Sequence, residues 1–168
     1  MITNFLLDNS ALVPVVLVLA VVLCVGVGCV VLRSRRFAVR VLWVLVALSV
    51  LPVLALTLVP TRSRVESVAC VIQFSAPTVG SVELLANVAL FVPPVYFGAL
   101  STRRPLPTLV VAAVFSAAIE TVQALIPAIG RACDTNDWAM NTAGAVVAAI
   151  LAAATMAVTA RATSRSEP

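Results

Sequence analysis

Five long apolar segments constrain the fold of this chain more than any other feature. Each holds roughly 17 to 23 residues, and short polar stretches separate them. A helix needs about 20 residues to cross a bilayer core of about 30 Å, and it pairs its own backbone polar groups, which lipid cannot satisfy. We therefore predict an all-α, multi-spanning transmembrane bundle of about five helices. The predicted helices are Leu12–Leu32, Val41–Val59, Leu84–Leu100, Thr108–Ile126 and Trp138–Ala160.

The composition argues against a water-soluble fold. Of the 168 residues, 62% are hydrophobic and only 11% are charged, whereas soluble domains average about 45–50% and about 25%. Little chain remains outside the five segments, so we expect residues 1–168 to form a single membrane domain. The net charge of +4 comes from eleven Arg and no Lys. In a membrane protein such an excess reports orientation, and we expect no nucleic-acid partner.

The distribution of arginine predicts how the chain sits in the membrane. With the N-terminus outside the cytoplasm and the C-terminus inside, eight Arg fall on the cytoplasmic side. The three on the outer side are Arg62, Arg64 and Arg131. Cytoplasmic loops carry the excess of basic residues, so this orientation is the expected one. The first segment has no basic residue before it and is longer than the core of a signal peptide, so we expect it to be retained as a helix.

Two of the four cysteines fall in predicted outer loops. Cys70 follows the second segment, and Cys133 precedes the fifth. Outside the cytoplasm such a pair is expected to form a disulfide. Closing a loop of about 60 residues contributes on the order of 4 kcal/mol in the chain-entropy model. The alternative is two free thiols.

Polar side chains gather near the predicted outer ends of the last three helices. A charged group at mid-bilayer costs about 2.5–3.5 kcal/mol, so these residues are informative. Spacings of three and four place pairs of them on one helical face. Glu120 lies deepest, roughly 10 Å from the helix end at 1.5 Å per residue, and we expect Arg131, Gln123 and Asn141 to partner it. The candidate cluster comprises Glu83, Asn87, Glu120, Gln123, Arg131, Asp134, Asp137 and Asn141.

Purely structural roles are the alternative for each of these residues. The amides would be interhelical hydrogen bonds, each worth under about 2 kcal/mol. Glu120 would belong to a buried ion pair, and Asp137 would cap the last helix. Gly144, Ala148 and Ala152 are spaced by four, which favours a close-packing helix face over a ligand site. These roles leave unexplained why the polar groups converge at one end.

At these positions the sequence resembles the VanZ-like family of bacterial membrane proteins, named for an accessory protein of glycopeptide resistance that lowers susceptibility to teicoplanin. Three ordered motifs carry the resemblance, between Glu83 and Gly144. A departure is Pro94-Val95, where the family usually has an apolar residue followed by Gly. The matching positions are Glu83, Asn87, Phe91 and Pro93 (E-x3-N-x3-F-x-P), Glu120 and Gln123 (E-x2-Q), and Arg131, Asp134, Asp137, Asn141 and Gly144 (R-x2-D-x2-D-x3-N-x2-G).

The resemblance implies a multi-pass protein of the bacterial cytoplasmic membrane, but no settled reaction. We favour a non-enzymatic envelope protein whose outer polar pocket binds a membrane lipid, a lipid-linked cell-wall precursor or a glycopeptide. One alternative is an enzyme for a lipid-linked substrate, with Glu120 as acid or base and Asp134 or Asp137 as its partner or as a metal ligand. Another is a structural subunit. The chain has no His, which rules out a Ser–His triad and disfavours a soft metal. We expect no cofactor and no metal.

Overall fold

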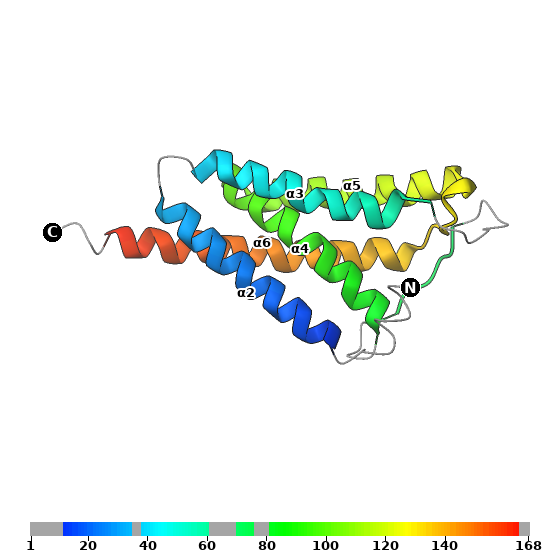
Figure 1. The fold of residues 1–168 in the computed structure, drawn as a ribbon, viewed down its shortest axis with the longest axis horizontal. Helices are drawn as coiled ribbons and strands as arrows, with labels where there is room; N and C mark the ends of the chain where they lie inside the picture. The colour runs from blue at the N-terminus through cyan, green and yellow to red at the C-terminus, as the bar shows by residue number, and fades with distance from the viewer. Residues whose placement is uncertain (1–11, 35–37, 61–69, 76–80, 165–168) are drawn as a thin grey trace.

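The predicted helices are present. The structure is a computed structural model that describes residues 12–34, 38–60, 70–75 and 81–164. In these residues five α-helices run back and forth (Figure 1), and each is long and apolar enough to cross a bilayer. The elements are α2 (Leu12–Arg33), α3 (Ala38–Leu58), α4 (Val82–Thr102), α5 (Pro105–Leu125), the short 3-10 helix η1 (Pro127–Ile129) and α6 (Thr135–Ser164).

Several helices extend beyond their apolar segments. The last one begins at Thr135, three residues before the predicted start, and α5 begins at Pro105. Proline is well tolerated in the first turn of a helix because the amide hydrogen it lacks has no intrahelical partner there. Between α4 and α5 only Arg103 and Arg104 remain, and Arg103 has φ 56° in the left-handed region. This short turn forces α5 to run back along α4.

The central helix is α4, which packs against each of the other four spanning helices and most extensively against α6. The largest fully buried side chains include Phe91, Tyr96 and Leu100, all from α4. Tyr96 also makes a buried hydrogen bond, with 3.0 Å between its hydroxyl oxygen and Oγ1 of Thr155 in α6. The core of the bundle is therefore the α4–α6 interface and the residues around it.

Small residues allow α6 to approach α4 closely. Gly144, Ala148 and Ala152 are all buried, with both alanines at 0% exposure. A side-chain carbon at Gly144 would overlap the main-chain carbonyl of Val88 in α4. The predicted close-packing face is confirmed.

The outward faces of the helices are apolar. Leu23 of α2, Leu51 of α3 and Val111 of α5 are 66%, 61% and 67% exposed. Water would penalise so large an exposed apolar surface, whereas the acyl chains of a bilayer solvate it. The outer surface is thus adapted to lipid, and polar chemistry is concentrated at the helix ends.

Candidate binding site at the polar end of the bundle

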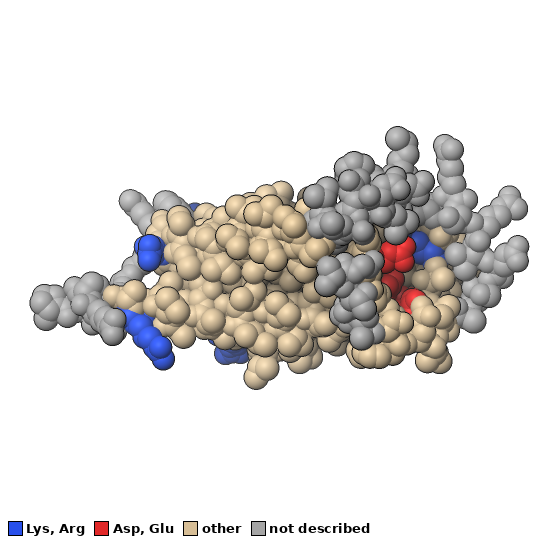
Figure 2. All heavy atoms as spheres, turned by 90° about the horizontal axis from the view of Figure 1, so that it is seen from below, with Lys and Arg blue, Asp and Glu red and all other residues tan. Residues whose placement is uncertain are grey.

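Six of the eight candidate residues meet at one end of the bundle, where α4 and α6 begin and α5 ends. We call this the polar end. Figure 2 shows acidic side chains gathered there beside a basic one, while the other basic side chains in view lie toward the opposite end. We use the name acidic cluster for the carboxylates there together with the neighbouring Asn87 and Arg131. Its members are Glu83 and Asn87 of α4, Glu120 of α5, Arg131 and Asp134 of the connection between α5 and α6, and Asp137 of α6.

Glu120 is the most buried carboxylate of the acidic cluster, with 7% of its surface exposed. Its Oε2 accepts a hydrogen bond from the main-chain N–H of Asp134, with 2.9 Å between N and O. The Asp134 side chain accepts two more, from Asn136 N at 2.8 Å and from Gln73 Nε2 at 2.6 Å. The bond from Asn136 is that of a helix N-cap. Asp134 therefore caps α6, which corrects the alternative in which Asp137 is the cap.

Asp137 is thereby free to join α6 to α4. Asn87 Nδ2 donates to Asp137 Oδ1 with 2.6 Å between N and O. The charges of Glu83, Asp134 and Arg131 all act on Asp137, and the charges of Asp134 and Asp137 act on Glu120. The predicted convergence of carboxylates from three helices is therefore present in the structure, with Arg131 close enough to interact electrostatically with Asp137.

The two remaining candidates, Gln123 and Asn141, bond elsewhere. Gln123 Nε2 donates to the main-chain oxygen of Thr57 in α3, at 2.9 Å. Asn141 Nδ2 donates to Ser116 Oγ of α5, also at 2.9 Å. Both are the interhelical hydrogen bonds of the structural alternative. We expected these amides and Arg131 to partner Glu120, but the main-chain amide of Asp134 supplies the bond, because the connection before α6 folds back over Glu120.

Each of these two amides keeps one buried oxygen without a hydrogen-bond partner in the described part of the chain. The orientation of Gln123 is fixed, since the Thr57 carbonyl can only accept and must face the NH2 group. Its Oε1 is therefore the unpaired atom. A buried polar atom of this kind normally finds a partner in the protein, in water or in a ligand.

A segment between α3 and α4 is held against the polar end. Cys70 and Cys133 form the predicted disulfide, with 4.6 Å between their Cα atoms. Beside it, Val71 pairs with Asp134 as a parallel bridge, through Val71 N to Cys133 O at 2.9 Å and Thr135 N to Val71 O at 3.1 Å. The disulfide and the bridge together set the position of the residues that follow them.

Sequence reasoning missed Gln73, which this segment brings to Asp134. A loop residue has no helical periodicity that would assign it a face. The available signal was its position three residues after Cys70, whose expected disulfide partner directly precedes Asp134.

The chemistry of the acidic cluster is that of a hydrogen-bond acceptor. Within the described residues no group of three or more His, Cys, Asp or Glu is arranged to hold a metal ion. Glu120, Asp134 and Asp137 instead each accept a hydrogen bond from an amide. The arrangement suits a ligand that carries donors, such as hydroxyl, amide or ammonium groups.

The spanning helices and apolar exterior define a multi-pass membrane protein with acidic groups at one end of its bundle. The sequence model of the VanZ/LLP1 family matches residues 15–157, and the chain therefore belongs to that family. The match confirms the resemblance and extends it over α2 and α3. Comparisons with curated proteins and with solved structures gave no match.

Proposed function

We propose that this protein is an envelope protein of the bacterial cytoplasmic membrane that binds a ligand at the polar end and thereby lowers susceptibility to teicoplanin-type antibiotics. The ligand is a lipid, a lipid-linked cell-wall precursor or a glycopeptide. The observation that carries the proposal is the deep position of Glu120, 7% exposed and next to the carboxylates of Asp134 and Asp137. Packing alone gives no reason to gather several carboxylates there.

The proposed orientation places the polar end outside the cytoplasm. Arg131 lies at the polar end, while Arg62 and Arg64 lie outside the described residues. Positive residues favour the cytoplasmic side, and a disulfide persists in an oxidising compartment. Both support an outer polar end and a cytoplasmic C-terminus. The basic side chains at the opposite ends of the helices are Arg33, Arg40, Arg103, Arg104 and Arg161.

The polar groups also suggest which chemistry the ligand carries. Gln123 Oε1 is buried and unpaired in the described residues, and leaving such an atom unsatisfied costs about 1–3 kcal/mol. Glu120 and Asp137 add acceptor oxygens at the same end of the bundle. Cell-wall precursors and glycopeptides are rich in hydroxyl and amide donors, which matches this excess of acceptors. This chemistry supports a binding role, with no reaction required.

Complementation of a deletion strain with Glu120→Gln tests the proposal. Glutamine keeps an acceptor for the Asp134 amide and removes the charge, so the protein should insert and accumulate normally. We expect teicoplanin tolerance to be lost. Asp137→Asn and Asn87→Ala should weaken it, because Asp137 loses its charge or its hydrogen-bond donor.

The matched control is Glu66→Gln, the same chemical change at a glutamate outside the family motifs and outside the described residues. It should leave tolerance unchanged. Full tolerance in the Glu120→Gln strain would contradict the proposal. A loss of tolerance that only parallels a loss of protein would also contradict it. The acidic cluster would then have a purely structural role.

A further inference from the structure

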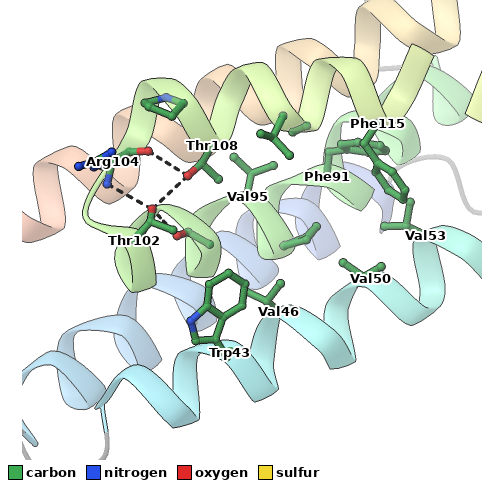
Figure 3. Close-up of a pocket in the computed structure, with 15 residues that line it drawn as sticks. Trp43, Val46, Val50, Val53, Phe91, Val95, Thr102, Arg104, Thr108 and Phe115 are labelled. Carbon is green, nitrogen blue, oxygen red and sulfur yellow. Dashed lines mark hydrogen bonds between the residues drawn. The ribbon is translucent and has the colours of Figure 1, made fainter. Parts of the chain in front are cut away.

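A second feature lies away from the polar end: an apolar cavity of about 410 Å³ on the side of α4 between α3 and α5. We call it the α3–α5 groove. Figure 3 shows side chains from the three helices turned toward one another around it. Its lining includes Trp43 and Val50 of α3, Phe91 and Val95 of α4, and Arg104 and Phe115 on the α5 side.

The groove exists because α3 and α5 both pack on α4 but make few contacts with each other. A glycine makes the groove deeper. Gly98 of α4 has no side chain there, and an added carbon would lie 3.2 Å from Thr108 Cγ2. Groove residues also reach the outer surface, since Trp43 is 51% and Val111 67% exposed. In a membrane the groove is therefore open to the surrounding lipid.

One end of the groove carries an arginine whose backbone is held by hydrogen bonds. Arg104 lies in the two-residue turn before α5, and Thr102 and Thr108 hold its backbone. Arg104 N donates to Thr102 Oγ1 at 3.2 Å, and Thr108 Oγ1 donates to Arg104 O at 2.9 Å. A groove lined by apolar side chains and by the two threonines thus has an arginine at one end.

We propose that the α3–α5 groove binds one acyl chain of an anionic glycerophospholipid, with the lipid phosphate paired to the Arg104 guanidinium. The chain passes Val50 and Val95 and ends between Phe91 and Phe115. Charge complementarity selects this occupant, because arginine pairs with phosphate through charge-assisted hydrogen bonds. The volume lies in the range of about 300–1,000 Å³ typical of ligand sites. Trp43 lines the groove, and its indole suits the membrane interface.

This lipid site is separate from the acidic cluster and does not depend on the proposed function. The groove is lined by α3, α4 and α5, and none of Glu83, Glu120, Asp134 or Asp137 lines it. The lipid in the groove would support the packing of α3 and α5 on α4, whereas the polar end would take the ligand of the proposed function. A failure of one proposal leaves the other standing.

Tryptophan quenching tests the site, because Trp43 lines the groove and Trp138 does not. Trp138→Phe protein is reconstituted in phosphatidylcholine vesicles that contain an equal fraction of acyl-brominated phosphatidylglycerol or acyl-brominated phosphatidylcholine. We expect the phosphatidylglycerol to bind about tenfold more tightly beside Trp43, as one charge-assisted contact provides. When Arg104→Gln is added to Trp138→Phe, the ratio of the two lipid affinities should fall to about one. Equal quenching by both lipids in the Trp138→Phe protein without a further substitution would overturn the proposal.

Three controls distinguish binding in the groove from surface potential and from unspecific contact of lipid with the helices. Arg33→Gln removes a charge at the same end of the bundle and should keep the lipid preference; an equal loss there would reduce the effect to surface potential. Val50→Phe fills the groove and should lower quenching by both lipids, whereas Val44→Phe, at a 56% exposed position of α3 outside the groove, should not. Equal quenching in these two variants would also overturn the proposal. In Trp43→Phe, Trp138 should report no lipid preference.

Discussion

Replacing Gly144 by Ala should loosen the main interface of the bundle. The added carbon would overlap the main-chain carbonyl of Val88, and α4–α6 is the most extensive helix pair. A side chain in the way could rotate, but a main-chain carbonyl can move only with its helix. The substitution therefore has to push α6 away from α4 along its small-residue face.

The size of the effect follows from the packing. Inserting a methyl group into a well-packed core costs about 1–3 kcal/mol, and the rigid contact at Gly144 places it in the upper half of that range. Gly26 is the matched control, since nothing lies within 4 Å of an added carbon there, and Gly26→Ala should keep or raise stability, because alanine favours a helix over glycine by about 0.5–1 kcal/mol. Gly28→Ala should fall between them, because its added carbon meets the side chains of Tyr96 and Leu100.

Unfolding in mixed micelles with increasing SDS measures the three variants under one condition. The transition midpoint of Gly26→Ala should be no lower than that of the unsubstituted protein, with Gly28→Ala lower and Gly144→Ala lowest. If Gly144→Ala unfolds at the same midpoint as Gly26→Ala, the close approach of α6 to Val88 is refuted.

Three further outcomes are expected. Under thiol-blocking conditions, intact mass should show two alkylatable thiols, and reduction of the Cys70–Cys133 bond should lower the free energy of unfolding by about 4 kcal/mol; four thiols would contradict the bond. Tyr96→Phe should cost about 0.6–1 kcal/mol, with a coupling in a double-mutant cycle with Thr155→Val; additive effects would argue against their hydrogen bond. A reporter enzyme that works only in the cytoplasm should be active when it is fused after Arg104. Activity of a periplasm-specific reporter at the same position would contradict the predicted orientation.

The helices could be predicted from the sequence because membrane spans are set by length and hydropathy alone. Their ends could not. Thr135 and Pro105 are helical in the structure, although they lie outside the apolar segments, because helix ends form in polar sequence where caps such as Asp134 satisfy the first amides. Hydropathy reports where lipid begins, which differs from where the helix begins.

Most of the acidic cluster could also be predicted, since residues three or four apart share a helical face. That rule placed Glu83 and Asn87 on one face of the third predicted helix, near its outer end. It could not assign partners, because the bond to Glu120 comes from the backbone of a connection that has no periodicity. The α3–α5 groove could not be predicted from the sequence for a related reason. It depends on the angles at which three helices pack, and patterns within single helices do not encode those angles.

The proposed function requires Glu120 to be the centre of a ligand site at the polar end. The most direct test extracts and profiles, by mass spectrometry, the lipids and cell-wall precursors that copurify with equal amounts of folded unsubstituted, Glu120→Gln and Glu66→Gln protein. We predict a species rich in hydroxyl or amide donors that is enriched over the bulk membrane in the unsubstituted and Glu66→Gln proteins and lost from Glu120→Gln. The same species in the same amount in all three would contradict the claim.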